Sequence, residues 1–418
     1  MTTWLRIVEP DKAERPVVRP FTPEALERAA EIISDVERNG DRAVRMWAER
    51  LGDIEHGQRL VVQNDELKRA LGDIEKERRA LLERTAERIT TFAEAQRRAL
   101  EDVAVTVDGG RAEARWYPVQ SAGCYAPGGR FPLPSSLLMT ALTARAAGVD
   151  RVVVASPRPS RMVLAAAALA GAEALVAAGG AQAVAALAFG VESVTGCDVV
   201  VGPGNSYVTA AKYLLSDRVG IDMMAGPSEL VAVADGTARP ELVAADLLAQ
   251  AEHDPEAFVA LVSTDAGIVE RCNEELGRQL NALSSPGTAK QAIRRGFSVI
   301  VKDVECALRL VDRLAPEHVS LHIEDAGRVR ASVRCYGAMF AGERSTVVFG
   351  DYGAGPNHVL PTGGSARFRG GLSVADFMAW RTSLTIDSPD GLVGDTAALA
   401  RIEGLEAHAR AAEIRGHT

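Results

Sequence analysis

The feature that most restricts the fold of this chain is a regular alternation, between residues 123 and 235, of short apolar runs with alanine-rich stretches. The runs are continuous and rich in valine, as in RVVVASP and DVVVGPGN, whereas RMVLAAAALAG and AQAVAALAFG between them have helical character. Strands that are apolar on both faces and are joined by helices are typical of a parallel sheet with helices on both sides. This segment therefore predicts an α/β fold.

Several of these apolar runs end in turns of glycine or proline, at Ser156-Pro157, Gly179-Gly180 and residues 202–205. Such turns mark the carboxyl edge of a parallel sheet, where open α/β folds bind ligands. No Gly-x-Gly-x-x-Gly fingerprint and no Gly-Lys dipeptide is present. If the chain binds a dinucleotide, it does so in an atypical way.

The alternation continues after Asp235 with FVALVSTD, FSVIVKD, EHVSLHIED and AMFAGE, separated by helical stretches at 240–253, 266–283 and 303–314, which predicts a second α/β unit. Before the first unit, residues 21–103 are helical and highly charged, and Thr22 is placed to cap the first of these helices. From Asp376 the pattern is mostly helical to the end.

Length and composition exclude several classes of protein. The 418 residues suffice for two or three domains, and 47 basic against 56 acidic residues give a net charge of −9, which disfavours nucleic-acid binding. No apolar stretch is long enough for a signal peptide or a membrane span. The five cysteines lie far apart, so we expect free thiols and a cytoplasmic protein.

One candidate for chemistry is the glycine-rich turn CYAPGGRFPLPSS at 124–136. Gly128 and Gly129 would let backbone amides approach a phosphate, and Ser135 and Ser136 would supply hydroxyl groups. The alternative is a purely structural loop.

A second candidate is the pair Gln250 and His253 in ELVAADLLAQAEHD. Residues three apart on a helix share a face, so an amide oxygen and an imidazole would lie side by side as metal ligands that suit zinc. The alternative is a polar helix end.

In LAPEHVSLHIED, His318 and His322 have a spacing that would suit a helix, but the residues between them alternate as in a strand. Positions four apart on a strand are separated by about 13 Å, too far for one metal ion. We therefore expect Glu317 and His318 to form a general acid/base pair, and His322 to be a surface histidine.

Two further candidates lie late in the chain. Asp351 and His358 are set among glycines and prolines in FGDYGAGPNHVLPTGG, a rigid polar turn that suits either a site or a structural loop. Glu403 and His408 fall in IEGLEAHARAAEIR, which by itself is typical of a solvated helix face.

The motifs QAEHD, LAPEH, GDYGAGPNHVLPTGG and EGLEAH follow one another in this order. Together with CYAPGG, GGAQAVAALAFG, GPGNSYVTAAK and DMMAGPSE, they make the chain resemble the zinc-dependent histidinol dehydrogenases over nearly its whole length. Each motif is weak by itself, but eight in register point to this family.

The resemblance implies one zinc ion per subunit, NAD as the second cofactor, and a homodimer that exchanges its C-terminal tails. The implied zinc ligands are Gln250, His253, Asp351 and, reaching in from the other subunit, His408. The implied catalytic pair is Glu317 and His318, and the implied substrate contacts are Ser228, Gln250, His253, His318, Asp351, His358, Glu403 and His408. The implied NAD contacts are Tyr125, Gln182 and Asn205.

The fold that the resemblance implies consists of two incomplete Rossmann-like domains with parallel sheets, one inserted in the other, plus helical N- and C-terminal extensions. Residues 26–122 and 231–372 are expected to form the first domain and residues 123–230 the second, dinucleotide-binding domain. Residues 1–25 are then an N-terminal extension, and residues 373–418 a helical tail that contributes to the other subunit's site.

The implied reaction is the four-electron oxidation of L-histidinol through L-histidinal to L-histidine with two NAD, a step of histidine biosynthesis. A neutral imidazole suits removal of the hydroxyl proton, which assigns this role to His318, and the carboxylate of Glu317 suits activation of the water that adds to the aldehyde. The zinc ion is expected to orient the imidazole and amine of the substrate.

One departure from the family pattern concerns the substrate. Val347 stands four residues before Asp351, where histidinol oxidisers usually carry glutamate. Losing a charged contact with the substrate's amine would cost on the order of 1.5–3 kcal/mol. The alternatives are therefore a related dehydrogenase of another small alcohol, such as sulfopropanediol, and a metal-dependent binding protein without catalysis, which would not need the acid/base pair.

Overall fold

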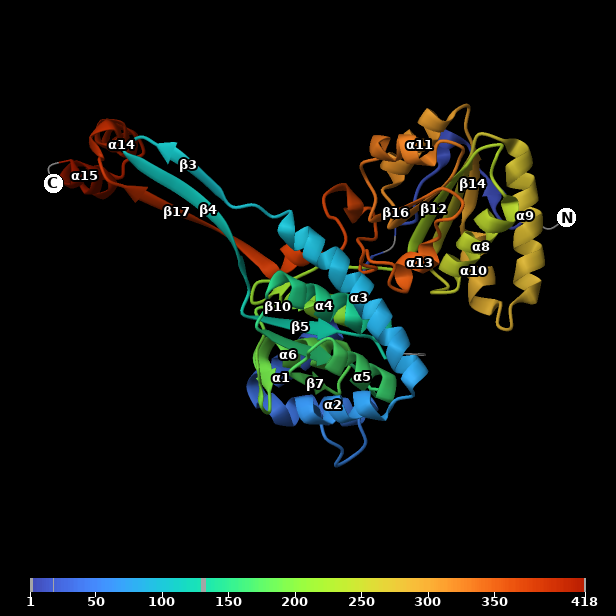
Figure 1. Ribbon diagram of the computed structural model, residues 1–418, viewed down its shortest axis with the longest axis horizontal. Coiled ribbons are helices and arrows are strands. Elements are labelled where there is room, and N and C mark those ends of the chain that lie inside the picture. The colour runs from blue at the N-terminus through green and yellow to red at the C-terminus, as the bar shows by residue number, and fades with distance from the viewer. Residues whose placement is uncertain (1–2, 18, 129–132, 417–418) are drawn as a thin grey trace.

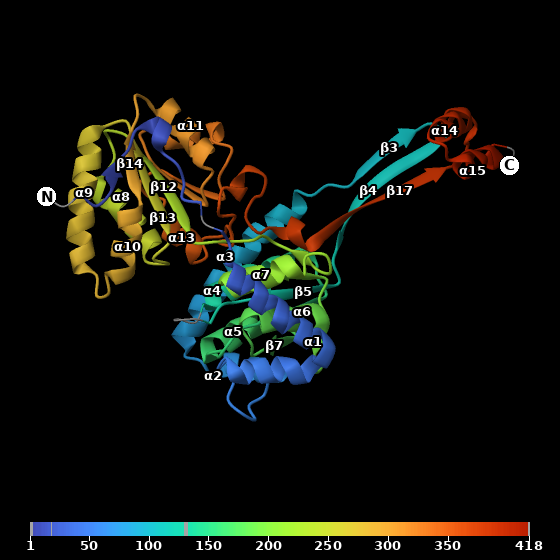
Figure 2. The same cartoon turned by 180° about the vertical axis from the view of Figure 1, so that it is seen from behind.

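The computed structural model describes residues 3–17, 19–128 and 133–416. The chain forms two lobes and an arm that projects away from both (Figures 1 and 2). Each lobe is built on a parallel sheet that is covered by helices, so the α/β fold expected from the sequence is confirmed. No helix in the described ranges is long and apolar enough to cross a membrane.

Lobe 1 surrounds a sheet with the strand order β11-β10-β5-β6-β7-β2, parallel except that β2 pairs antiparallel with β7. The strands are β2 (Val61–Gln63), β5 (Ser121–Tyr125), β6 (Arg151–Ala155), β7 (Ala174–Val176), β10 (Val199–Val201) and β11 (Gly220–Ile221), and a small hairpin is formed by β8 (Gly190–Val191) and β9 (Val194–Thr195). The helices are α1 (Pro23–Arg50), α2 (Asn64–Asp73), α3 (Lys76–Arg98), α4 (Pro134–Ala147), α5 (Arg161–Leu169), α6 (Gly180–Phe189) and α7 (Ser206–Leu214).

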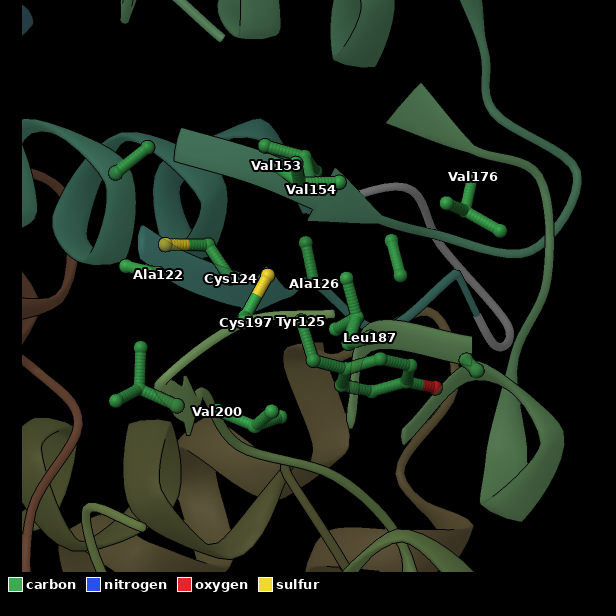
Figure 3. Close-up of a cluster of buried hydrophobic side chains, with 14 of the residues drawn as sticks. Ala122, Cys124, Tyr125, Ala126, Val153, Val154, Val176, Leu187, Cys197 and Val200 are labelled. Carbon is green, nitrogen blue, oxygen red and sulfur yellow. The ribbon is translucent and has the colours of Figure 1, made fainter. Parts of the chain in front are cut away.

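The core of lobe 1 consists mainly of alanine and valine side chains around β5 (Figure 3). Small side chains let α6 lie close to the sheet, and at Gly123 a Cβ atom would come within 3.0 Å of the Leu187 side chain. Cys124 and Cys197 are both buried here and behave as small apolar residues. All five cysteines of the chain are free thiols, as expected.

The helices between residues 23 and 98 do not pack where we expected them. In the structure α1 packs against α6 and α7, α2 against α5, and α3 against α4, so residues 26–98 belong to lobe 1 with residues 123–230 and not to the domain of residues 231–372. The periodicity of a helix shows which of its faces is apolar, but it does not show which sheet that face covers.

Lobe 2 surrounds the parallel sheet β1-β14-β13-β12-β15-β16. Its strands are β1 (Arg6–Ile7), β12 (Glu229–Ala234), β13 (Phe258–Ser263), β14 (Phe297–Ile300), β15 (His318–His322) and β16 (Ala338–Ala341). Its helices are α8 (Pro240–Ala251), α9 (Ala266–Ala282), α10 (Gly287–Arg295), α11 (Val304–Leu314), α12 (Ala326–Val329) and α13 (Val347–Asp351), with 3₁₀ turns at η1 (Pro10–Lys12) and η2 (Arg330–Ser332).

Because β1 pairs with β14, the N-terminal segment belongs to lobe 2, and lobe 1 is inserted in the chain between β1 and β12. The N-terminal extension that we expected to be helical is thus an edge strand. The 3₁₀ turns η3 (Ser365–Arg367) and η4 (Val374–Phe377) follow lobe 2, and Phe377 is fully buried in the core of lobe 1.

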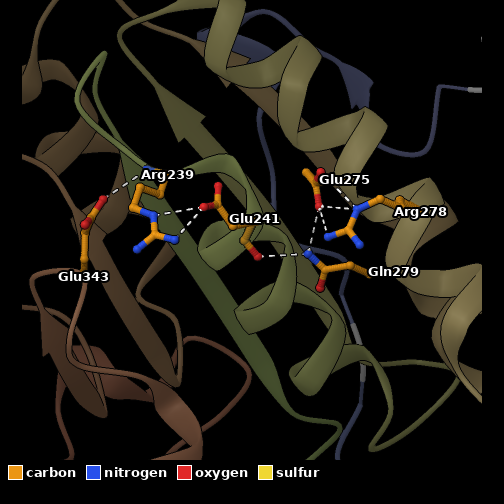
Figure 4. A network of polar contacts seen from close by, with 6 residues as sticks. All are labelled: Arg239, Glu241, Glu275, Arg278, Gln279 and Glu343. Carbon is orange, nitrogen blue, oxygen red and sulfur yellow. Dashed lines mark hydrogen bonds and ion pairs between the residues drawn. The ribbon is translucent and has the colours of Figure 1, made fainter.

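The outer surface of lobe 2 carries a network of charged and amide side chains on and beside α8 and α9 (Figure 4). Glu241 accepts hydrogen bonds from Arg239, and Glu275 accepts them from Arg278 and Gln279. Exposed ion pairs of this kind each contribute about 0–1 kcal/mol to the free energy of unfolding, so this network adds little to the stability of lobe 2.

The arm consists of the antiparallel sheet β17-β4-β3 and two terminal helices. Its elements are β3 (Val103–Val107), β4 (Gly110–Pro118), β17 (Met378–Ile386), α14 (Asp390–Ile402) and α15 (Glu406–Arg415). The expectation that the chain is mostly helical from Asp376 was wrong for β17, whose Trp380 packs on Trp116 of β4 at 4.7 Å between ring centroids. At the tip of the arm, Ile402 and Ile414 are 82% and 66% exposed.

Candidate active site

A cleft of about 350 Å³ lies where the carboxyl edge of the lobe 1 sheet meets the amino edge of the lobe 2 sheet. Pro127, Pro203 and Gly204 follow strands of lobe 1, whereas Glu317 and His318 stand at the start of β15 in lobe 2. Seven of the zinc, catalytic and substrate residues implied by the resemblance line this cleft: Ser228, Gln250, His253, Glu317, His318, Asp351 and His358. The candidate phosphate ligands Ser135 and Ser136 also line it.

The imidazole of His318 is held from one side. Its Nδ1 lies 3.0 Å from the backbone carbonyl of Glu229 and 3.4 Å from Oε2 of Glu317. A carbonyl oxygen only accepts hydrogen bonds, so Nδ1 carries the proton and donates. Nε2 is buried and has no hydrogen-bond partner, which leaves its lone pair available to a molecule in the cleft.

The charge of the site favours the protonated form of His318. Burial by itself opposes protonation, but the carboxylates of Glu317 and Asp351 and the carbonyl of Glu229 outweigh it and raise the pKa of His318 to about 9. The pKa of Glu229, buried beside Glu317, is raised to about 7 because burial and the neighbouring carboxylate both disfavour its charged form.

Glu229, the first residue of β12, also connects this strand to β15, where Glu317 and His318 lie at the start. Its backbone N–H donates to Oε2 of Glu317 over 2.8 Å, and its own carboxylate accepts from the backbone N–H groups of Glu317 and Gly363. This reciprocal arrangement fixes the carboxylate of Glu317 at the cleft wall. Sequence reasoning missed Glu229, although a carboxylate at the head of the buried run ELVAVA was a signal that could have identified it.

Three of the predicted metal ligands approach one another. Gln250 stands in the last turn of α8, and His253 follows the end of this helix, so the two remain neighbours although His253 is not helical. Nε2 of His253 lies 3.8 Å from Oδ2 of Asp351, a separation that one ion with bonds of about 2.0–2.1 Å can bridge. Oε1 of Gln250 is buried without a hydrogen-bond partner, as expected of an oxygen that ligates a metal.

His358 has both ring nitrogens engaged. Nδ1 donates to the backbone carbonyl of Asp351 over 2.8 Å, and Nε2 lies 3.0 Å from Oγ of Ser136. Burial lowers the pKa of His358, so this imidazole is a neutral group that fixes the loop after α13. Ser136, a candidate phosphate ligand whose alternative was a structural role, thus contacts a histidine, and Gly129 lies outside the described residues.

The three predicted NAD contacts lie at the carboxyl edge of the lobe 1 sheet. Tyr125 ends β5, Gln182 is buried in the first turn of α6, and Asn205 caps α7 by accepting from the N–H groups of Tyr207 and Val208. The strand order reverses between β5 and β10, and Tyr125 and Asn205 follow these two strands, which is where open α/β sheets bind ligands.

Two observations fit a ligand at this edge. Oε1 of Gln182 and Oγ of Ser156 are buried without a hydrogen-bond partner. The Nε2 group of Gln182 donates to Asp53 over 2.7 Å, and Asp53 also accepts from the N–H of Gly179. Asp53 was not predicted, because nothing in its loop indicates that it holds a residue 129 positions later.

Glu403 and His408 are not at the cleft of their own subunit. Both are exposed and belong to the helices at the tip of the arm, which Figures 1 and 2 show far from the junction of the lobes. Within the described ranges, no three His, Cys, Asp or Glu side chains are close enough to hold a metal ion. Of the predicted metal ligands, the cleft thus offers His253, Asp351 and the amide of Gln250.

Val347 does not line the cleft. Its side chain is 1% exposed and packs in the hydrophobic cluster of lobe 2, at the start of α13. Burial in this core accounts for an apolar residue at this position, and the idea that Val347 faces the substrate has no support in the geometry of the described cleft.

The remaining histidines differ in their surroundings. His56 is exposed, and His417 lies outside the described residues. The prediction that His322 is a surface histidine was wrong, because it is 1% exposed and contacts Asp246 and Ser320. The strand alternation correctly placed His318 and His322 on one strand, but it could not show that α8 covers this face.

Comparison with known proteins agrees with this geometry. The histidinol dehydrogenase family model matches residues 19–416. The histidinol dehydrogenase of Thermus thermophilus is 43% identical over 399 residues, covering 94% of this chain and 95% of the relative, and that of Cereibacter sphaeroides is 43% identical over 408 residues, covering 95% and 93%. The crystal structure of the histidinol dehydrogenase from Elizabethkingia anophelis superimposes with a TM-score of 0.92 at 30% identity, covering 99% of this chain and 98% of that one.

Proposed function

This chain belongs to the histidinol dehydrogenase family, and from that premise we propose that it oxidises L-histidinol through L-histidinal to L-histidine with two molecules of NAD, as a step of histidine biosynthesis. The observation that carries the proposal is a pair of buried, unpartnered polar atoms in one cleft, Nε2 of His318 and Oε1 of Gln250. The first suits proton abstraction and the second suits metal binding.

Gln250, His253 and Asp351 would hold the zinc ion, which when bound would supply a fixed cationic point that orients the imidazole and amine of the substrate. His408 of the partner subunit would be the fourth protein ligand. Support for this comes from the exposed arm: its tip carries Glu403 and His408 away from their own cleft, and its apolar surface suits a homodimer in which the arms are exchanged.

His318 acts as the base of both oxidation steps in its neutral form, which the carboxylates of Glu317 and Asp351 disfavour in the metal-free protein and which a cation bound to Asp351 would favour. Its Nε2 would accept the proton of the substrate hydroxyl, and NAD, when bound, would take the hydride from the same carbon, which leaves the aldehyde and one proton on His318. The carbonyl of Glu229 keeps the proton on Nδ1 and thereby keeps Nε2 directed at the cleft.

Glu317 activates the water that adds to the aldehyde. Its carboxylate is 8% exposed, lies next to His318, and is fixed by the N–H of Glu229, so it can accept a proton from a water molecule at the cleft wall. As the water adds, His318 would return its proton to the aldehyde oxygen, which completes the hydrate and frees Nε2. A second NAD, when bound, would take the hydride from the hydrate while Nε2 accepts a hydroxyl proton, and the product loses its remaining acidic proton to solvent as the carboxylate.

Lobe 1 binds NAD at the carboxyl edge of its sheet. Tyr125, Gln182 and Asn205 surround the end of β5 and the first turns of α6 and α7, and the helix N-termini here suit the pyrophosphate. Ser228, His358 and, from the other subunit's arm, Glu403 complete the substrate contacts. The free thiols are those of a protein that works in the reducing cytoplasm.

The test is NADH formation from L-histidinol compared with a panel of small alcohols that includes sulfopropanediol, using zinc-loaded dimeric protein. We expect two NADH per histidinol consumed. Turnover of another alcohol without turnover of histidinol would assign the chain to a related dehydrogenase, and absence of any NADH formation would favour a binding protein.

Two variants test the roles assigned to single residues. Glu317→Gln should slow the second oxidation far more than the first, because water addition is lost while His318 remains. His408→Ala should lose zinc, and full zinc content in this variant would contradict a metal site shared between subunits.

A further inference from the structure

Below the cleft, lobe 2 contains a buried cluster of polar side chains that the proposed reaction does not use: Asp246, Ser320, His322 and Thr346. Oδ1 of Asp246 accepts from Oγ1 of Thr346 over 2.7 Å. Oδ2 of Asp246 accepts from Oγ of Ser320 over 2.9 Å and lies 3.1 Å from Nε2 of His322. Asp246, Ser320 and His322 are 5%, 1% and 1% exposed, so solvent does not weaken the contacts among these three, whereas Thr346 is half-buried.

This cluster connects the three elements that carry the site. Asp246 lies on α8 one turn before Gln250. Ser320 lies on β15 two residues after His318, and Thr346 caps α13, the five-residue helix that ends at Asp351. The carboxylate of Asp246 therefore bonds to β15, which carries His318, and to Thr346, which caps the helix ending at Asp351. Its own helix, α8, carries Gln250.

We propose that Asp246 is a positioning residue that fixes Gln250, His318 and Asp351 relative to one another. The inference rests on the proposed function, because it concerns the same metal and the same base. Asp246 does not touch substrate or cofactor; it acts through the helix and strand ends that it joins.

The chemistry of the cluster favours a carboxylate at this position. Both oxygens of Asp246 accept hydrogen bonds, Oδ1 from the cap of α13 and Oδ2 from β15. An asparagine has one accepting oxygen and one donating nitrogen, so it accepts from only one of these hydroxyl groups, and the other hydroxyl has to turn and accept from the amide N–H. Asp246→Asn therefore keeps the shape of the side chain but removes its charge and reverses one of the two bonds that join α13 and β15.

Ser320, His322 and Asp246 also have the residue types of a nucleophilic triad, but their geometry excludes that role. In a triad the two nitrogens of the histidine contact the serine and the carboxylate separately. Here Nε2 of His322 faces both partners, Nδ1 has no partner, and Ser320 donates directly to Asp246. The hydrogen bonds of the cluster thus join α8 to β15 and to the cap of α13.

The experiment compares metal binding by dimeric Asp246→Asn, Thr346→Val and Thr346→Ser proteins with wild type, in the absence of substrate and NAD. Cobalt(II) replaces zinc as the probe, because its absorption spectrum reports the geometry of its ligands, and chelator competition gives its affinity. The control is Asp235→Asn, since Asp235 likewise accepts from loop residues Thr237 and Glu324, but at the opposite end of the same sheet.

We expect Asp246→Asn to lose about 10–100-fold in cobalt affinity and to change the cobalt spectrum, as is typical when residues that support metal ligands are altered. Thr346→Val should show a smaller change in the same direction, Thr346→Ser should restore the wild-type spectrum, and Asp235→Asn should leave it unchanged. In turnover with L-histidinol, KM should rise more than kcat falls, because the metal orients the substrate.

A folded Asp246→Asn protein with wild-type cobalt affinity and spectrum would overturn this inference and leave the proposed function intact. Wild-type protein that binds no cobalt or zinc would overturn both. If Asp246→Asn fails to fold, the Thr346→Val and Thr346→Ser pair carries the test, since Thr346→Val removes both the bond to Asp246 and the hydrogen bond that caps α13, whereas Thr346→Ser keeps the hydroxyl that makes both.

Discussion

Replacing Gln250 by leucine should make the metal-free protein more stable and abolish its stabilisation by zinc. Gln250 is 1% exposed and its Oε1 atom has no hydrogen-bond partner, so the folded apoprotein bears the cost of burying an unsatisfied carbonyl. Leucine has a similar volume and no polar atom, and it would lie beside the apolar residues of α8.

The magnitude follows from these two facts. Leaving a buried acceptor without a partner costs about 1–3 kcal/mol, so Gln250→Leu should raise the free energy of unfolding of the apoprotein by about that amount. A ligand present at a thousand times its dissociation constant stabilises the folded state by about 4 kcal/mol. Wild type should therefore overtake the variant once zinc is added.

The assay is equilibrium unfolding in denaturant, with chelator or with excess zinc, for both proteins. Gln279→Leu is the control, because the amide of Gln279 donates to the carbonyl of Glu241 over 2.9 Å (Figure 4), so its loss should destabilise the protein and leave the zinc effect unchanged. A less stable Gln250→Leu apoprotein, or one that zinc stabilises as much as wild type, would refute the reasoning.

Two further predictions concern charge. Asp351→Asn removes one of the carboxylates that raise the pKa of His318 to about 9, so the pKa of His318 in the metal-free protein should fall. NMR titration of the ring protons of His318 measures this pKa. An unchanged value would show that Asp351 does not act on His318. The pKa of Glu229 is raised from 4.5 to about 7, so its contribution to stability is present below about pH 4.5 and is lost as the pH rises through 7. Between pH 4.5 and pH 8, Glu229→Gln should thus gain on the order of 1–3 kcal/mol of unfolding free energy relative to wild type in chemical denaturation, and a pH-independent difference would contradict the raised pKa.

The parts of the fold that could be predicted are those where one sequence pattern has one structural meaning. The run FVALVS forms β13, as expected of a short apolar run between turn residues. The segment VECALRLVDRL forms α11, as expected of apolar residues that recur every three or four positions. The strand MAWRTSLTI was missed because it lies in an exposed arm, where no buried face imposes a clear alternation.

The site could be predicted only in part for the same reason. Glu317 and His318 are adjacent in sequence, and Gln250 and His253 are three apart, so local geometry brought each pair together. Asp246 and Thr346 are separated by 100 positions, and their contact depends on how α13 packs on α8. Long-range contacts of this kind have no local signal.

The central claim is that each active site combines one subunit's cleft with its partner's arm, and hybrid dimers test it most directly. Glu317→Gln and His408→Ala proteins, each of low activity alone, are unfolded together, refolded and assayed with L-histidinol, NAD and zinc. If the sites are shared, a hybrid dimer has one intact site, and a statistical mixture should recover about a quarter of wild-type activity. If each subunit instead uses its own His408, every site in the mixture keeps one defect, and activity no higher than that of the parent variants would contradict the account.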